Sequence, residues 1–298
     1  MYRIVQKRKT WFSFSVLLII VSFYFIFTNS LKFGIDFTGG SLINYSFSNE
    51  RPHPNEINEK LKDLSLGEIT IQPVGDSDLS IRLKNIDEAK HQQVLSTLSE
   101  NYEGINEISF ETIGPTIGKE LRQKSITATV LVLLFILIYI TFVFRKAGTE
   151  KFKSWMLGLG AIIALIHDII IVVGFYAILC KFTNAEVNTL FITALLTVLG
   201  FSIHDTIVVY DRIRERLKSN LDDNFETTVN VSLNQTMVRS INTSLTTILV
   251  LLSLFIFGGE TIRWFNLTLI VGIFIGTYSS IFIASSLLIT WHNYLNKE

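Results

Sequence analysis

Two His-Asp pairs interrupt long apolar stretches of the sequence. His167-Asp168 lies near the middle of one stretch, and His204-Asp205 lies in the latter half of another. An Asp at the centre of a membrane helix costs about 2.5–3.5 kcal/mol on insertion scales, so such residues face protein or water and often mark ion pathways. A carboxyl group held between burial and a nearby Arg can load and release a proton as its surroundings change. The placement of Asp205 therefore predicts a proton pathway.

Each pair also has a plainer interpretation. Buried His and Asp can simply hydrogen-bond to a neighbouring helix, and this alternative weighs more for Asp168 than for Asp205. For His167 and His204, a packing role fits the sequence at least as well as a proton relay. A transition-metal site built from both pairs fits by ligand type, but nothing in the sequence makes the two helices neighbours. We therefore expect protons as the coupling ion and no other cofactor.

The helices that must hold these pairs appear as apolar blocks. Of 298 residues, 49% are hydrophobic and only 17% are charged, whereas soluble proteins carry about a quarter charged residues. Crossing a bilayer takes about 20 mostly apolar residues. Six stretches qualify: 12–28, 126–144, 156–180, 189–210, 243–257 with polar flanks, and 265–291. The sequence therefore predicts an α-helical membrane protein with six transmembrane helices, five of them forming a bundle within 126–298.

Helical spacing identifies two faces within these stretches. One face joins His204 to a hydroxyl-lined stripe that contains Thr193, Thr197 and Gly200. In the last stretch, small residues recur every four positions at Gly272, Gly276, Ser280 and Ala284. Small residues allow helices to approach closely, so the second face predicts helix packing.

Composition excludes several classes of protein. The 26 basic residues equal the 26 acidic ones, which argues against a nucleic-acid binder. The single cysteine, Cys180, rules out an intramolecular disulfide framework and a multi-thiolate metal site. The sequence contains no His-Glu-x-x-His, Gly-x-Ser-x-Gly or phosphate-loop motif, so we do not expect an enzyme.

Basic residues predict the orientation, because Lys and Arg concentrate in cytoplasmic loops. The two short outer loops near 181–188 and 258–264 hold only Lys181 and Arg263. The inner segments would hold the rest of the flanking charge: Arg3, Lys7, Arg8, Lys9, Arg145, Lys146, Lys151, Lys153, Arg212, Arg214, Arg216, Lys218, Arg239 and Lys297. Both termini are therefore expected inside. Residues 1–29 form the cytoplasmic N-terminus and a first span that lacks a signal-peptidase site and is expected to remain as an anchor.

The soluble segments lie on both sides of the membrane in this scheme. Residues 30–125 alternate strand and helix patterns in the order βαββαβ, the ferredoxin-like split βαβ arrangement. The predicted fold of this outer domain does not indicate a function, because proteins with this fold have many different functions. On the inner side, residues 211–241 are expected as a cytoplasmic loop, with Asn224 capping an amphipathic helix. That helix could stabilise the bundle at the interface or dock a partner, and we favour the first.

Four motifs distinguish the chain from other six-span proteins. They are Phe33-Gly-Ile-Asp-Phe-Thr-Gly-Gly40, Ile113–Leu121, Gly200–Glu215 and Asn234–Thr247. Turn chemistry explains Gly39-Gly40 before a strand and Pro115 at a helix start, but it does not explain an apolar, aromatic octapeptide beside the membrane. With these motifs in this order and layout, nearly the whole chain resembles the SecD/SecF family of bacterial protein-export membrane proteins, which belongs to the RND superfamily.

The resemblance assigns roles to particular residues. It implies that Asp205 is the functional intramembrane carboxylate and that Arg239 is its basic counterpart. Asp168 and His204 complete the expected proton pathway. The motif at the outer membrane face supplies Gly34, Asp36, Phe37, Thr38, Gly39 and Gly40.

The resemblance also implies a function and partners. The chain would be one RND-type half that pairs with a SecD-like six-span chain as a heterodimer. Together they would use the proton motive force to complete translocation of unfolded preproteins, beside the SecY/SecE/SecG channel and a YajC-type auxiliary in the bacterial inner membrane. The alternative is a half-transporter of the same superfamily for a small molecule, a lipid or a metal.

Overall fold

The computed structural model of the chain describes residues 2–29, 31–49, 51–144, 155–219 and 224–295. Within them the chain divides into two compact units. The first, which we call the membrane unit, comprises Met1–Leu31, Ala128–Lys181 and Leu190–Glu298. The second, which we call the sheet unit, comprises Lys32–Thr127 and Phe182–Thr189. Some basic residues on which the predicted orientation depends lie outside the described residues: Arg145, Lys146, Lys151, Lys153 and Lys297.

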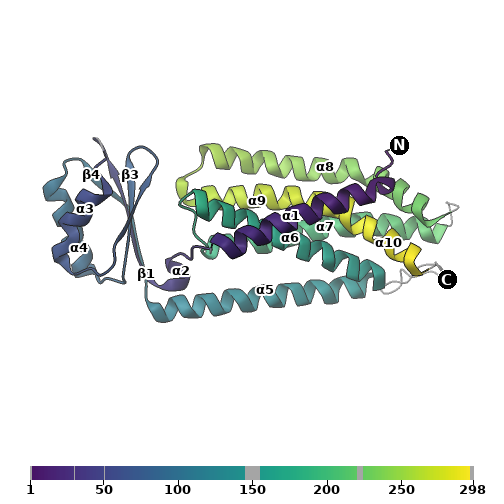
Figure 1. The fold of residues 1–298 in the computed structure, drawn as a ribbon, viewed down its shortest axis with the longest axis horizontal. Helices are drawn as coiled ribbons and strands as arrows, with labels where there is room; N and C mark the ends of the chain where they lie inside the picture. The colour runs from purple at the N-terminus through teal and green to yellow at the C-terminus, as the bar shows by residue number, and fades with distance from the viewer. Residues whose placement is uncertain (1, 30, 50, 145–154, 220–223, 296–298) are drawn as a thin grey trace. The chain divides into compact units, whose positions relative to one another are not determined.

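Six helices in the described residues are long and apolar enough to cross a membrane. They run roughly side by side in Figure 1, and they confirm the six predicted stretches. Their elements are α1 (Arg8–Asn29, preceded by the short turn η1, Val5–Lys7), α5 (Pro115–Phe144), α6 (Trp155–Phe182), α7 (Thr189–Ser219), α8 (Phe225–Phe257), and a last span made of α9 (Glu260–Tyr278), η3 (Ser279–Ala284) and α10 (Ser285–Leu295).

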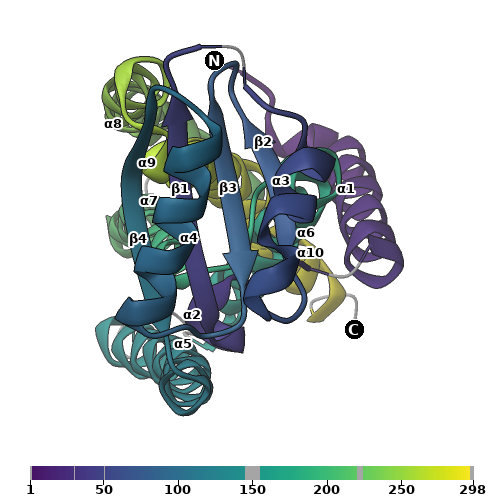
Figure 2. The same ribbon diagram turned by 90° about the vertical axis from the view of Figure 1, so that its left-hand side faces the viewer.

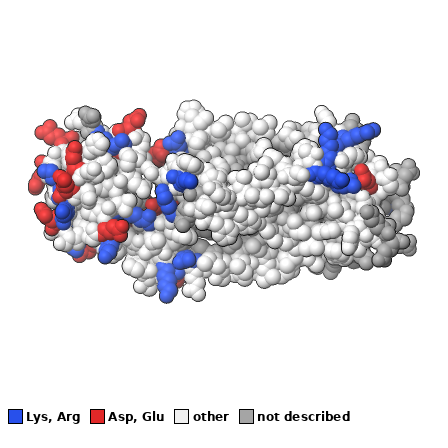
Figure 3. Space-filling view, viewed as in Figure 1, with Lys and Arg blue, Asp and Glu red and all other residues white. Residues whose placement is uncertain are grey.

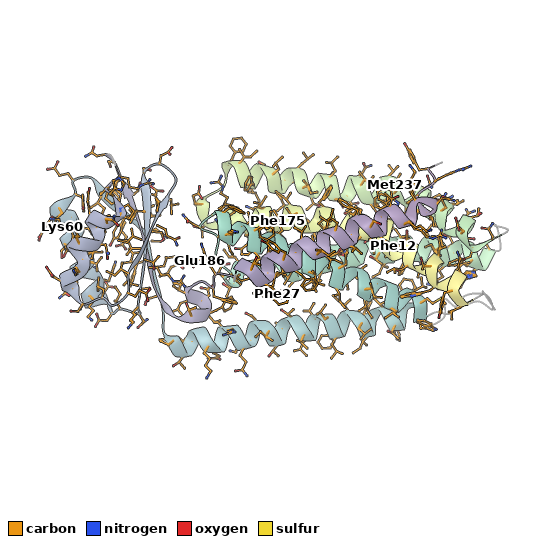
Figure 4. All side chains as sticks on the ribbon, viewed as in Figure 1. Phe12, Phe27, Lys60, Phe175, Glu186 and Met237 are labelled. Carbon is orange, nitrogen blue, oxygen red and sulfur yellow. The ribbon has the colours of Figure 1, made fainter. Side chains whose placement is uncertain are left out.

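The helices differ in how much of their surface the unit buries. In α6, α7 and the last span about half of the most apolar stretch is buried within the protein. In α1, α5 and α8 most of that stretch is exposed. Phe27 of α1, labelled in Figure 4, is 79% exposed. The middle of this unit is almost free of charge on the face seen in Figure 3. Such a surface suits contact with lipid or with another apolar chain.

The segment expected as an inner loop is largely helical. Residues 211–219 continue α7, and α8 begins directly after Asn224. The Asn224 Oδ1 accepts the Thr227 N–H at 2.8 Å, the N-cap that the sequence predicts. From there α8 runs through to Phe257 without a break, so the amphipathic segment and the fifth span are one helix.

The last span contains one π-helical turn, η3. Turns of this kind are rare inside helices and are common at functional sites. Neighbouring polar groups stabilise it: the Ser280 Oγ donates to the Ser202 carbonyl at 3.1 Å, and the Tyr210 hydroxyl donates to the Ala284 carbonyl at 3.2 Å. The irregular turn is therefore fixed against α7.

The sheet unit has the predicted βαββαβ order. Its strands are β1 (Gly40–Phe47), β2 (Thr70–Val74), β3 (Asp78–Leu83) and β4 (Ile105–Ile113), and its helices are α2 (Ile35–Thr38), α3 (Pro54–Leu61, followed by η2, Lys62–Leu64) and α4 (Glu88–Asn101). The strands pair antiparallel in the order β2-β3-β1-β4. Helices α3 and α4 lie on one face of the sheet (Figure 2). The ferredoxin-like prediction is confirmed.

The core of the sheet unit lies between the sheet and these two helices. Ile43 pairs with Ile81 on one side and with Phe110 on the other, at the centre of the sheet. Ile57 of α3 and Leu98 of α4 are fully buried against that face. The alternation that predicted the strands thus corresponds to one buried face and one polar face.

Candidate functional site

Asp168 of α6 is fully buried, and side chains from its own helix and two others reach it. The Ser202 Oγ of α7 donates to the Asp168 Oδ2 at 2.5 Å, and the Ser279 Oγ, at the start of η3, donates to the same oxygen at 2.8 Å. The Nδ1 of His167 lies 2.9 Å from the Asp168 Oδ1. We call this group the Asp168 centre, and it joins α6, α7 and the last span.

The Asp168 centre has no continuation through its histidine. The Nε2 of His167 is buried and forms no hydrogen bond with the residues that the structure describes. Within the described residues the network therefore ends at this ring, and a role for Asp168 in a proton pathway stays a prediction. Because breaking a buried polar network is costly, this arrangement suits a fixed clamp between helices.

Asp205 of α7 lies in a looser environment, although it is only 6% exposed. The Thr277 Oγ1 of α9 donates to the Asp205 Oδ2 at 3.1 Å. Thr277 is in turn 2.5 Å from the Ser244 Oγ of α8. Ser240 lies near the same carboxylate, yet its hydroxyl is buried and forms no hydrogen bond within the described residues. We call these residues the Asp205 centre. Its hydroxyl groups run from the carboxylate through Thr277 to Ser244 on α8.

The His204 side chain lies at the surface of the unit, within range of an electrostatic interaction with Asp205. His204 is exposed, as are Thr193, Thr197 and Gly200 on the same face of α7, whereas Asp205 faces α8 and α9. The hydroxyl-bearing stripe therefore lies on the surface of the unit. A role for His204 in a proton pathway stays a prediction.

Arg239 is exposed on α8, and its neighbours on that face are polar. Asn242, Thr243 and Thr246 are exposed beside it, and the Thr243 Oγ1 donates to the Arg239 carbonyl at 2.9 Å. Among the described residues no ion pair joins Arg239 to Asp205. Its role as the counterpart of Asp205 stays a prediction.

The octapeptide Phe33–Gly40 contains the short helix α2, which is followed by two glycines with tight backbone contacts. Gly39 and Gly40 have φ values of 72° and 130°, the positive values that the sequence predicts. A Cβ on Gly39 would lie 2.8 Å from the Cα of Pro115, and one on Gly40 would lie 2.9 Å from the Leu83 carbonyl oxygen. Both the backbone angles and the lack of space thus require glycine. Phe37, two residues before Gly39, is buried.

The octapeptide also contacts the segment before α7, which sequence reasoning missed. The Asp36 Oδ2 accepts the Thr189 N–H at 2.8 Å and the Thr189 hydroxyl at 2.6 Å. The Gly34 N–H donates to the Val187 carbonyl at 2.9 Å. Glu186, labelled in Figure 4, pairs with Arg82 of β3 at 2.7 Å. Burial raises the pKa of Glu186, although Arg82 opposes this.

Several residues of these sites left no signal in the sequence. Ser202, Ser279 and Thr277 are ordinary hydroxyl residues in apolar stretches, and only the helix packing brings them to the carboxylates. The small-residue face of the last span was the nearest clue, because Gly276 lies against Ser202: a Cβ there would lie 2.9 Å from the Ser202 Cβ.

These features define a multi-pass membrane protein with a ferredoxin-like unit after its first helix and two buried carboxylates in its bundle. The family described as "Protein export membrane protein SecD/SecF, C-terminal" matches residues 93–294, and the "SecD/SecF GG Motif" matches residues 24–50, which contain the octapeptide. The chain belongs to the SecD/SecF family.

Curated relatives cover nearly the whole chain. Protein translocase subunit SecF of Thermobaculum terrenum is 43% identical over 98% of this chain and 95% of the relative. The subunit of the same name from Anaerolinea thermophila is 37% identical over the same shares. That of Haemophilus influenzae is 38% identical over 94% of this chain and 83% of the relative.

The solved structures similar to the chain include two of SecDF. The crystal structure of SecDF, a translocon-associated membrane protein from Thermus thermophilus, matches with a TM-score of 0.85 at 32% identity. The match covers 98% of this chain and 39% of the SecDF chain. SecDF in its super-membrane-facing form matches with a TM-score of 0.70, again over 39% of that chain. This chain therefore corresponds to about two fifths of a SecDF chain.

Proposed function

We propose that the chain is the SecF-type subunit of the bacterial Sec translocase, and that it uses the proton motive force together with a SecD-like six-span chain. In this proposal the pair completes translocation of unfolded preproteins beside the SecY/SecE/SecG channel and a YajC-type auxiliary. Both termini lie in the cytoplasm and residues 30–125 lie in the periplasm. The chain catalyses no chemical reaction, and protons are its coupling ion.

The environment of Asp205 is the observation that carries the proposal. A carboxylate in a membrane helix is costly to retain, and such residues commonly serve ion or proton movement. The hydroxyls of Thr277 and Ser244 form a chain from Asp205 on α7 through α9 to α8. Hydroxyls both donate and accept hydrogen bonds, so they can pass a proton along such a chain. One charge moved across 100 mV gains about 2.3 kcal/mol, which biases a two-state equilibrium more than tenfold.

Exposed polar groups on two spans support a partner chain. Arg239, Asn242 and Thr246 of α8 and His204 of α7 are exposed in helices that cross the membrane. Polar and charged residues in membrane spans normally face other helices or water rather than lipid. A second six-helix chain would cover these faces. The SecDF match agrees, because the larger part of that single chain has no counterpart here.

The test is export driven by membrane potential in vesicles that carry Asp205→Asn. The amide cannot take up and release a proton at physiological pH. We expect the potential-stimulated part of preprotein export to be lost, while the variant still assembles in the membrane. Asp211→Asn is the matched control, because Asp211 is an exposed acid on the same helix that forms only a surface pair with Arg214. Potential-stimulated export that is unchanged in Asp205→Asn would overturn the proton pathway.

The relatives also bear on the alternative of a half-transporter for a small molecule, lipid or metal. Those described above are named as translocase subunits, which favours export. Deletion of the chain should then cause a general secretion defect rather than sensitivity to one class of compound.

A further inference from the structure

We propose that Asp36 is a positioning residue that holds the first turn of α7, the helix that carries Asp205, and that Arg82 and Glu186 fix the octapeptide from which Asp36 acts. The consequence for export rests on the proposed function; the positioning itself does not. The sheet unit would then hold, through one carboxylate, the end of the helix that carries the proposed proton site.

The first argument is the geometry at Thr189. The first N–H groups of a helix have no partners within the helix, and α7 begins at Thr189. Asp36 accepts both the backbone N–H and the hydroxyl of this residue. A negative charge at a helix N-terminus is also favoured by the helix dipole. A cap usually comes from a residue just before the helix, whereas here it comes from a residue 153 positions earlier in the chain.

The second argument is the way in which the octapeptide is held. Arg82 lies on β3, and its guanidinium donates to the Glu186 Oε1 at 2.7 Å. It also donates to the Phe33 carbonyl at 2.8 Å and to the Thr38 hydroxyl at 3.1 Å. Both ends of the octapeptide and the segment before α7 therefore share one arginine. The pair is only about a quarter exposed at either residue, so solvent screens it less than a surface pair.

The backbone reinforces this contact. The Gly34 N–H donates to the Val187 carbonyl, and the Val187 N–H donates to the Lys32 carbonyl at 2.7 Å. A Cβ on Gly34 would lie 3.3 Å from the Glu186 Oε2. A Cβ on Gly118 of α5 would lie 2.8 Å from the Gly39 nitrogen. The glycines of the octapeptide and of α5 thus allow backbones to meet where Asp36 reaches Thr189.

The third argument is the continuity of α7. The helix runs from Thr189 to Ser219 without a break, and Asp205 lies about 24 Å along it by the helical rise. A helix transmits an axial displacement along its length much better than a loop does. A displacement at the first turn of α7 would therefore be transmitted along the helix toward Asp205. This accounts for the combination of glycines, one buried aromatic residue and one acid in the octapeptide.

The test is hydrogen exchange on the full-length protein in its membrane complex, with Asp36→Ala as the variant and Asp76→Asn as the matched control. Asp76 is an exposed acid in a turn of the same unit. Loss of the cap should speed exchange about fivefold to tenfold at the Thr189 amide and in the next turn of α7. Asp36→Asn keeps one acceptor oxygen and should give a smaller increase. Exchange at Thr189 that matches the control in both variants would overturn the proposal.

A second readout separates this proposal from the proposed function. Asp36→Ala should lower potential-stimulated export severalfold and leave the potential-independent part unchanged; a role in folding alone would lower both. If Asp205→Asn retains potential-stimulated export, the proton pathway fails, but faster exchange at Thr189 in Asp36→Ala still supports the cap. If Asp205→Asn loses that export and Asp36→Ala shows neither effect, only the positioning role fails.

Discussion

Asp168 and Asp205 lie in the same membrane unit, and the structure holds them in opposite ways. Asp168 is fully buried and receives two serine hydroxyls and a histidine ring nitrogen. Asp205 retains some exposure and receives a longer hydrogen bond from Thr277, with Ser240 and Ser244 beside the same carboxylate. From Thr277 the hydroxyls continue to Ser244, whereas the Asp168 centre ends at the unpartnered Nε2 of His167.

The difference shows that burial alone does not identify a proton site. Both acids lie in apolar helices and both follow a histidine, so the sequence favours Asp205 only by its position and by the family resemblance. The lengths of their hydrogen bonds separate them, because a carboxylate whose partners are held closely resists a change of charge. We infer that Asp168 stabilises the packing of three spans; the exchange of a proton at Asp205 stays a prediction.

The largest expected effect is on stability, and it separates the two acids. Asp168→Ala leaves two hydroxyls and a ring nitrogen without an acceptor in a dry interior, and breaking such a buried group costs about 3–5 kcal/mol. Asp205→Ala removes one long hydrogen bond and should cost about 1 kcal/mol. Denaturant unfolding of both variants in detergent measures the difference. Equal losses of stability would contradict the distinction between a clamp and an exchanging acid.

A smaller effect is expected when the donors to Asp168 are removed one at a time. Ser202→Ala and Ser279→Ala each delete one hydroxyl and should each cost about 1–2 kcal/mol. Ser286→Ala is the matched control, since Ser286 is equally buried but its hydroxyl forms no hydrogen bond within the described residues. Unfolding of the double variant should show that the two losses are not additive. Losses no greater than that of the control would argue against the clamp.

The smallest expected effect is a shift in the pKa of His91. This histidine has hydrogen-bond partners on both ring nitrogens, whereas His167 has a partner on one among the described residues. His91 of the sheet unit has partners on both ring nitrogens, with Glu107 at 2.8 Å and Glu88 at 3.2 Å, and it stacks on Phe110. Burial lowers the pKa of His91, but the hydrogen bonds to the two carboxylates outweigh it, so the pKa is raised. The stabilisation is therefore complete at acidic pH and is lost as the pH rises through that pKa.

Nuclear magnetic resonance of the His91 ring in the full-length protein can test whether the pKa of His91 is raised. The titration midpoint should lie above the ordinary histidine value of about 6.5. Glu107→Gln should lower the midpoint, because it removes the shorter of the two contacts with a charged group. A midpoint at or below the ordinary value would mean that burial, not the carboxylates, dominates at His91.

Local patterns predicted much of this structure. The six spans follow from the length of the apolar stretches, and the βαββαβ order follows from alternation. Asn224 as a cap and Gly39-Gly40 as positive-φ residues follow from local backbone chemistry. Each of these features depends on residues close together in the sequence, so the pattern carries the information.

Contacts between distant residues could not be predicted in this way. Ser279 lies 111 positions from Asp168, and Thr189 lies 153 positions from Asp36. Nothing in the local pattern marks these hydroxyl residues, because serine and threonine in a span usually bond to their own helix. The π-helical turn at Ser279–Ala284 likewise depends on packing against α7. The sequence therefore indicated where the buried acids lie, but not which residues hold them.

The central claim is that Asp205 gains and loses a proton while the charge state of Asp168 stays fixed. Infrared difference spectra of the membrane complex, recorded across a pH titration, detect the carbonyl stretch of a protonated carboxyl group directly. We predict a pH-dependent band in the unmodified protein that is absent in Asp205→Asn and retained in Ser202→Ala. Identical titrations of the unmodified protein and Asp205→Asn would contradict the account.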